Sequence, residues 1–205
     1  ALAGLGGLFF GKPAALLLLG LLMWAPAVAL GLLLRASMSL ALALEIALLA
    51  AAGLVIGQYV LGDPIAFWSA LMNDFLSQMT EPTVMGEADR ERMVADMAPW
   101  MVGGVAAAWF LQQALVLFLA RYWQAVLYNP GGCKVEFPDL RLRRWLFIAI
   151  AERLLASLVQ EQGGSPLAQF VLVLEAGMLV QGVALVHGLV GRLKAQTGWL
   201  IGFYS

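Results

Sequence analysis

The chain has 205 residues, of which 62% are apolar and only 12% are charged, and its formal net charge is −1. Soluble domains carry roughly 25% charged residues, so this composition excludes an ordinary soluble protein, and the mean hydropathy of +0.86 agrees. The near balance of acidic and basic residues gives no field that would attract nucleic acid. We therefore predict an all-α fold, a polytopic transmembrane helical bundle in a single domain, with the lipid bilayer as its main partner.

Two apolar runs near the start of the chain predict an antiparallel pair of membrane spans. Residues 14–34 contain no charge, and residues 38–61 are interrupted only by Glu45 and Gln58. Each run has the roughly 20 residues that cross a ~30 Å hydrocarbon core. Because the link between them is very short, the second helix must return alongside the first.

The stretch at residues 63–97 predicts two helices outside the bilayer. Asp63-Pro64 is a good helix start, with an aspartate cap followed by proline in the first turn. Residues 63–80 then carry an apolar face, which is formed by Ile65, Trp68, Leu71, Met72, Phe75, Leu76 and Met79. This pattern predicts an amphipathic helix in the membrane interface; the alternative is that it packs on the protein's own outer surface. Residues 87–97 predict a second, charged outer helix.

The later apolar runs predict three further spans, at residues 98–120, 145–160 and 167–191. Between the first two lies a basic loop at residues 121–144, with a turn at Asn129-Pro130. The 145–160 run is short and holds two central charges. Partial spans at residues 1–11 and 198–205 indicate a fragment of a longer protein.

The distribution of Lys and Arg predicts the orientation of these spans. Lys and Arg accumulate in cytoplasmic loops, and most of them fall in one set of loops, which contains Arg35, residues 121–144, Arg192 and Lys194. These basic loops all lie on the same side of the membrane only if residues 145–160 cross it. We therefore expect the 121–144 loop to be cytoplasmic, and the acidic segment at residues 63–97 to be periplasmic or extracellular, in a bacterial inner membrane.

Polar residues inside the predicted spans are the candidate functional site. A charge at the centre of a span costs about 2.5–3.5 kcal/mol on insertion scales, so such residues should face the bundle interior or a wet cavity. The candidate polar cluster consists of Glu45, Gln112, Gln113, Glu152, Arg153, Glu175 and Gln181. Depth in the bilayer favours an ion pair between Arg153 and Glu175. The alternative is that these groups only hold helices together.

Other chemistry is not indicated by the sequence. His187 is better interpreted as an interface residue than as a ligand, and Cys133 as incidental. Small residues at four-residue spacing, such as Gly103 and Ala107, allow close helix approach. We find no nucleophile–base motif, phosphate loop or dinucleotide fingerprint, and no metal or cofactor is expected. The protein is therefore predicted not to be an enzyme, with an intramembrane enzyme as a third reading.

Residues 121–132, RYWQAVLYNPGG, are followed by FPDLRL at 137–142 and by Gly198-Trp199 at a further span. This pattern resembles the YybS-like family of uncharacterised bacterial membrane proteins. That family is distantly similar to the S components of energy-coupling-factor vitamin transporters and to the rod-shape protein MreD. The resemblance implies a helical inner-membrane bundle without known catalytic residues. Two functions follow as hypotheses: a transport-related subunit that binds a small molecule, or a non-catalytic scaffold that docks another membrane protein or a second copy.

Overall fold

The computed structural model describes residues 13–79, 86–128, 140 and 166–192. Within these ranges the chain is almost entirely helical, as predicted. The described elements are α2 (Pro13–Ser37), α3 (Leu40–Leu61), α4 (Pro64–Met79), α5 (Glu87–Tyr128) and α8 (Pro166–Arg192). The predicted span at 145–160 and the partial spans at 1–11 and 198–205 lie outside the described residues.

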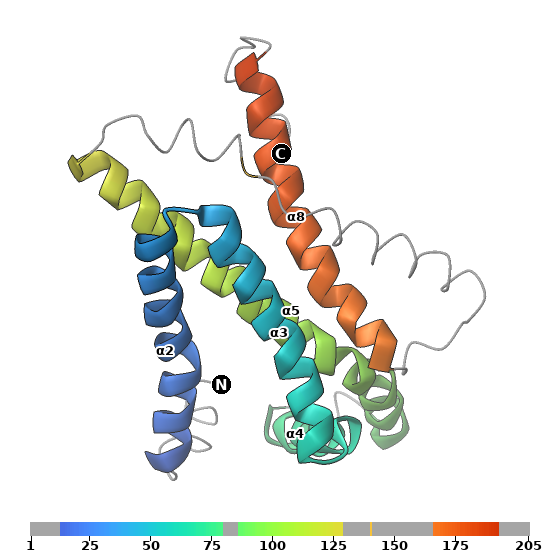
Figure 1. Ribbon diagram of the computed structural model, residues 1–205. Helices are drawn as coiled ribbons and strands as arrows, with labels where there is room; N and C mark the ends of the chain where they lie inside the picture. The colour runs from blue at the N-terminus through green and yellow to red at the C-terminus, as the bar shows by residue number, and fades with distance from the viewer. Residues whose placement is uncertain (1–12, 80–85, 129–139, 141–165, 193–205) are drawn as a thin grey trace.

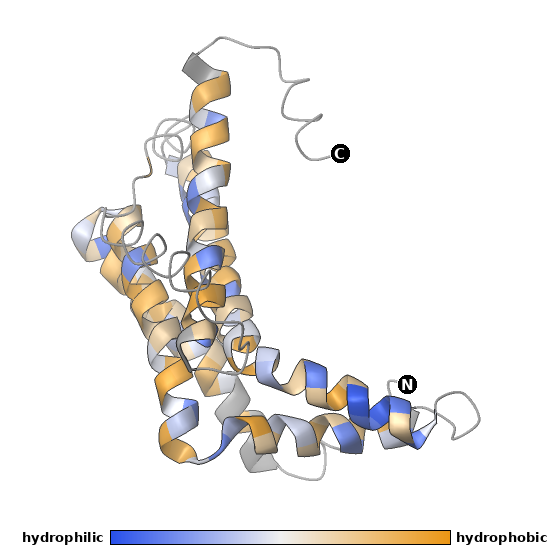
Figure 2. Ribbon diagram, turned by 90° about the vertical axis from the view of Figure 1, so that its right-hand side faces the viewer, coloured by the Kyte–Doolittle hydropathy of each residue, from blue (hydrophilic) through white to orange (hydrophobic). Residues whose placement is uncertain are grey.

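Four of these helices are long and apolar enough to cross a membrane. Their candidate spanning ranges are Gly20–Ser37, Leu40–Leu61, Glu87–Tyr128 and Ala168–Val190. Orange, apolar residues dominate the bundle helices in Figure 2. Many of the leucines on their outer faces are exposed, among them Leu21, Leu49, Leu115 and Leu185. This is the architecture of a multi-pass membrane protein, whose outward apolar faces contact lipid.

Helices α2 and α3 form the antiparallel pair that the short link predicts (Figure 1). Only Met38 and Ser39 separate them. Met38 adopts a left-handed conformation with φ of 53°, which reverses the chain direction. Ser39 caps α3, because its Oγ accepts a hydrogen bond from the Leu42 amide at 3.2 Å. The link therefore ends one helix and begins the next without a loop.

The turn from α3 into α4 is fixed by Gly62 and Asp63. Gly62 has a φ of 150°, which other residues rarely adopt. Asp63 Oδ1 accepts hydrogen bonds from the amides of Ile65 at 2.9 Å and Ala66 at 3.1 Å. The predicted aspartate cap is thus confirmed, with Pro64 at the first helical position.

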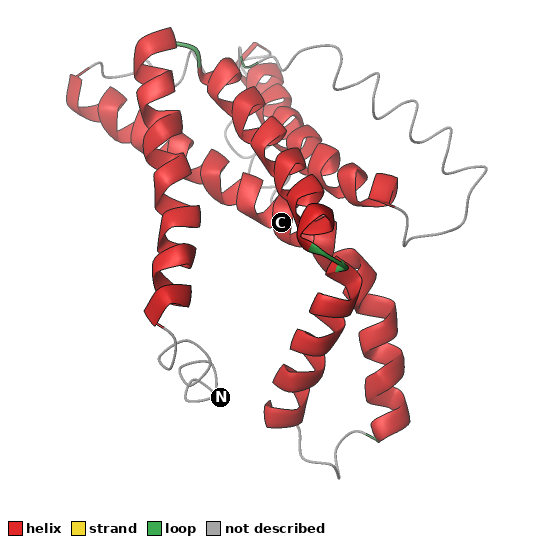
Figure 3. Cartoon of the chain, turned by 60° about the horizontal axis from the view of Figure 1, so that its bottom comes forward, coloured by secondary structure: helices red, strands yellow, loops and turns green. Residues whose placement is uncertain are grey.

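Helix α5 joins two segments that the sequence assigned to different environments. Its 42 residues extend about 63 Å at 1.5 Å per residue, roughly twice the thickness of the hydrocarbon core. The charged segment at 87–97 and the span at 98–120 are therefore one helix, with Pro99 inside it. Figure 3 shows α4 and the N-terminal part of α5 projecting together as a hairpin away from the other helices.

The C-terminal end of α5 also corrects the predicted boundary of the basic loop. The helix continues to Tyr128, so residues 121–128 are helical rather than part of a loop. Arg121, Gln124, Ala125 and Leu127 favour a helix, and Arg121 Nη1 donates to Gln124 Oε1 at 2.8 Å within the same helix. Asn129-Pro130 follows in the sequence, and the residue before a proline disfavours helical geometry.

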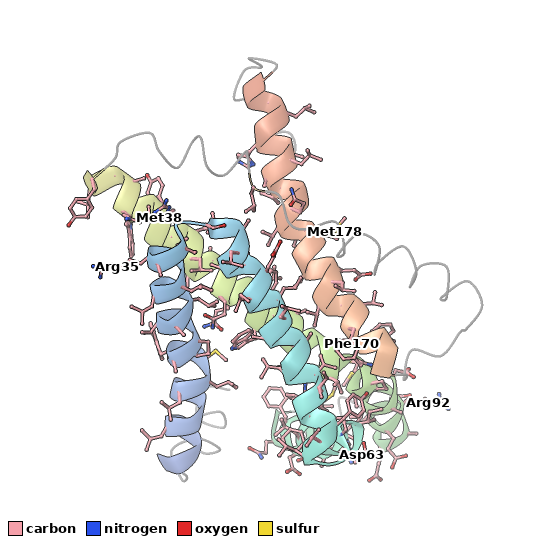
Figure 4. The ribbon with its side chains drawn as sticks, in the orientation of Figure 1. Arg35, Met38, Asp63, Arg92, Phe170 and Met178 are labelled. Carbon is pink, nitrogen blue, oxygen red and sulfur yellow. The ribbon has the colours of Figure 1, made fainter. Side chains whose placement is uncertain are left out.

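The core lies where α3, α5 and α8 contact one another, and α2 packs on α3 and α5. Phe110, Leu44 and Leu117 are the largest apolar side chains that are fully buried there. Figure 4 shows Arg35 and Met38 at one end of the bundle, and Asp63 and Arg92 at the other. The two ends of the bundle thus separate Arg35 from the hairpin of α4 and the N-terminal part of α5.

Candidate functional site

The structure divides the predicted polar cluster between the interior and the surface. Glu45 on α3 and Gln113 on α5 are buried, at 6% and 0% exposure, and Gln181 on α8 is half-buried. Gln112 and Glu175 are exposed on their helices, which differs from the interior position predicted for them. Glu152 and Arg153 lie outside the described residues, and with them the predicted pair between Arg153 and Glu175.

Glu45 is the buried acid of the described bundle. It lies in the second turn of α3, next to Leu44 and near Ala47 and Leu48, all of which are buried. Ile46, the next residue, faces outward and is 42% exposed. The inner face of a span is where we expect a carboxyl group, because its exposure to lipid would be costly. Among the acidic residues that the structure describes, Glu45 is therefore the one buried on the inner face of a span.

Two side chains of α5 donate to consecutive carbonyl oxygens of α2. Trp109 Nε1 lies 3.1 Å from Leu22 O, and Gln113 Nε2 lies 3.1 Å from Met23 O. Both acceptors lie in the turn that precedes Pro26. Proline has no N–H, so Leu22 O lacks its usual donor four residues later in the helix. Trp109 supplies that donor from the neighbouring helix.

Gln58 lies near the C-terminal end of α3 and connects α3 with α4 and α5. Its Nε2 donates to Val102 O on α5 at 3.0 Å, and its Oε1 accepts from Trp68 Nε1 on α4 at 2.9 Å. The Trp68 ring also contacts Phe67 edge to face, with centroids 5.4 Å apart. Both ends of this carboxamide are used, so Gln58 holds the outer helix α4 against the bundle.

Gln169 and Gly103 mark the closest described approach of α5 to α8. The Gly103 amide donates to Gln169 Oε1 at 2.9 Å, and Gln169 is fully buried. A Cβ atom at position 103 would lie 2.5 Å from the backbone oxygen of Gln169. Only glycine fits there, which supports the predicted role of the small-residue spacing in close helix packing.

Gln181 and His187 of α8 both contact backbone carbonyl oxygens. Gln181 Nε2 donates to the carbonyl oxygen of Leu140 at 2.9 Å, and Leu140 is buried in the core. His187 Nδ1 lies 2.9 Å from Val183 O, one turn earlier in the same helix. Within the described residues, no group of three or more His, Cys, Asp and Glu side chains is arranged to hold a metal ion.

The hydrogen bonds of these buried amides and indoles run mainly to backbone carbonyls of neighbouring helices. Sequence reasoning did not identify Trp109 and Gln169 as important. A signal for Trp109 was present, since a proline inside a span leaves a carbonyl that needs another donor. No comparable signal marks Gln169 before its distance to Gly103 is known. Comparison of the chain with protein-family models, curated proteins and solved structures finds no match.

Proposed function

We propose that this multi-pass membrane protein is a transport-related subunit that binds a small molecule inside its helical bundle, similar to an S component. The observation that carries the proposal is the burial of Glu45 on the inner face of a membrane span. An ionisable residue at such a position is costly, and in membrane proteins it marks a pathway or binding site by default. A buried carboxyl recognises a cationic or hydrogen-bond-donating group, so the ligand should carry one.

Membership of the YybS-like family and a place in a bacterial inner membrane belong to the same proposal. The motif at residues 121–132 and the FPDLRL segment support the family. The separation of Arg35 from the acidic outer hairpin supports an orientation with residues 121–144 in the cytoplasm. The outer hairpin of α4 and α5 then faces the periplasm or the exterior.

Native mass spectrometry of the protein in lipid nanodiscs tests the proposal. The wild-type protein, purified gently from its own membrane, should carry a bound small molecule. Glu45→Leu should lose that mass while the protein remains folded, and Glu45→Gln should retain a hydrogen-bonding ligand better than Glu45→Leu does. Glu91→Gln is the matched control, because Glu91 is exposed on the outer hairpin. A wild-type protein without any added mass would contradict the proposal.

A non-catalytic scaffold is the second candidate function. The side chains of Gln58, Trp109 and Gln169 all bind neighbouring helices, which favours a rigid bundle that presents its surfaces to a partner. Such a protein should co-purify with another membrane protein in gentle detergent. Neutralising Arg141, Arg143 and Arg144 should release that partner while membrane insertion is retained. A protein that remains a monomer at all concentrations would argue against this function.

A further inference from the structure

The carboxamide of Gln113 presents one hydrogen-bonding atom that the structure leaves without a partner. Its Nε2 donates to Met23 O, whereas its Oε1 is buried and accepts no hydrogen bond. The residue is completely buried on α5 within a membrane span. Buried side-chain oxygens in native proteins are nearly always paired, either with protein or with an ordered water. A lone acceptor at this depth therefore indicates a missing donor.

The orientation of the carboxamide is fixed by α2. Exchanging the two ends of the amide would place Oε1 3.1 Å from Met23 O, and two acceptors would then face each other. Nε2 must therefore remain on the side of α2. Oε1 consequently points away from Met23, and rotation of the side-chain amide cannot satisfy it.

Two other amides of the bundle, Gln58 and Gln169, do not share the unpaired side-chain oxygen of Gln113. Gln58 uses both its Nε2 and its Oε1. Gln169, which is also fully buried, has its Oε1 bonded to the Gly103 amide. Gln113 contacts α2 at Met23, three residues before Pro26.

We propose that Gln113 Oε1 accepts a hydrogen bond from a small neutral donor bound beside α5, on the side of the carboxamide that faces away from Met23. The donor is a water molecule or the O–H or N–H of a small ligand. Phe110, Ala114 and Leu117 on the same side of α5 are buried apolar residues, so a neutral donor loses less solvation there than a charged one would. Gln113 lies on α5, whereas Glu45 lies on α3.

A high-resolution structure of the full chain in lipid nanodiscs tests this site directly. The expected result is density within hydrogen-bonding distance of Gln113 Oε1 that neither protein nor lipid explains. Native mass spectrometry of the same sample separates the two sources. A chain of unmodified mass identifies a water molecule, and an added mass identifies an organic ligand. A site without density overturns the proposal.

Two neighbouring substitutions provide a matched test of the same site. Gln113→Met keeps the approximate side-chain size but removes the acceptor, so the density should disappear. The unfolding midpoint should fall by about 2–4 °C for each hydrogen bond of ordinary strength that is lost. Gln112→Met, at the exposed neighbour, should leave both the density and the midpoint unchanged. Persistence of the density in Gln113→Met would overturn the assignment to Oε1.

Discussion

The indole nitrogen of Trp109 donates a hydrogen bond to the carbonyl oxygen of Leu22 at 3.1 Å, and Leu22 is the residue whose carbonyl is deprived of its helical partner by Pro26. The donor that α2 lacks is thus provided by α5. In lipid no water replaces a lost backbone hydrogen bond, so such a carbonyl must be satisfied by protein. Pro26 removes the donor to Leu22 O and Trp109 replaces it, although these two residues are far apart in the sequence.

The first prediction is that replacing Trp109 by phenylalanine destabilises the bundle through Leu22. The loss should be about 0.6 kcal/mol and at most ~1.7 kcal/mol, the range for side-chain hydrogen bonds between membrane helices. Unfolding in a denaturing detergent measures it. Trp123→Phe is the control, since Trp123 is 58% exposed.

A double-mutant cycle makes the Trp109 prediction specific. Pro26→Ala restores an N–H that can bond to Leu22 O within α2. In that background Trp109→Phe should cost less than it does in the wild-type protein. An equal cost in both backgrounds would show that the indole stabilises the bundle by packing rather than by satisfying Leu22.

The second prediction concerns two adjacent glycines of α5. Gly103→Ala should destabilise the protein by about 1–3 kcal/mol, because its new Cβ meets the backbone of Gln169 and forces α5 and α8 apart. Gly104→Ala meets nothing within 4 Å, and alanine favours the helix, so that variant should be neutral or slightly stabilised. Thermal unfolding of both variants checks the difference. Equal effects would contradict the close approach at Gly103.

The third prediction concerns the attachment of α4. Gln58→Leu removes both the acceptor for Trp68 and the donor to Val102. Backbone amides in Pro64–Met79 should then exchange with deuterium faster, while those of α3 and α8 change little. Trp68→Phe should produce the same local effect. Gln78→Leu, at an exposed position of α4, should not. Unchanged exchange in both Gln58→Leu and Trp68→Phe would show that other contacts hold the hairpin.

The fourth prediction uses Cys133, the single cysteine of the chain. If residues 121–144 are cytoplasmic, a membrane-impermeant thiol reagent should label Cys133 only after the membrane is opened. In a Cys133→Ser background, Ser77→Cys on the exposed face of α4 should be labelled in intact cells. Labelling of both positions from the same side would contradict the proposed orientation.

Sequence patterns predicted helices well and side-chain environments less well. The apolar runs predicted where α2, α3 and α8 lie, because a bilayer imposes a minimum length on each span. The charged helix and the following span were predicted in different environments but form one helix, since α5 continues through Pro99 without ending.

The polar cluster shows why sequence alone was insufficient for the site. Gln112 and Gln113 are adjacent and chemically identical, yet one is exposed and the other is completely buried. Adjacent residues of a helix point in directions about 100° apart, so one glutamine can face the bundle while the other faces outward. Only the packing of Trp109 and Phe110 shows which face is inward. Glu175 is likewise on an outward face of α8. Hydropathy reports depth in the membrane, but not the direction in which a side chain points.

The link at Met38 and Ser39 has a consequence for how the protein is made. A two-residue link keeps the end of α2 next to the start of α3. Neither helix can therefore take up the opposite orientation in the bilayer without the other. We therefore expect the two helices to insert together as one hairpin, with Arg35 near its tip (Figure 4). A lengthened link would permit misoriented intermediates during synthesis even where the finished bundle is unchanged.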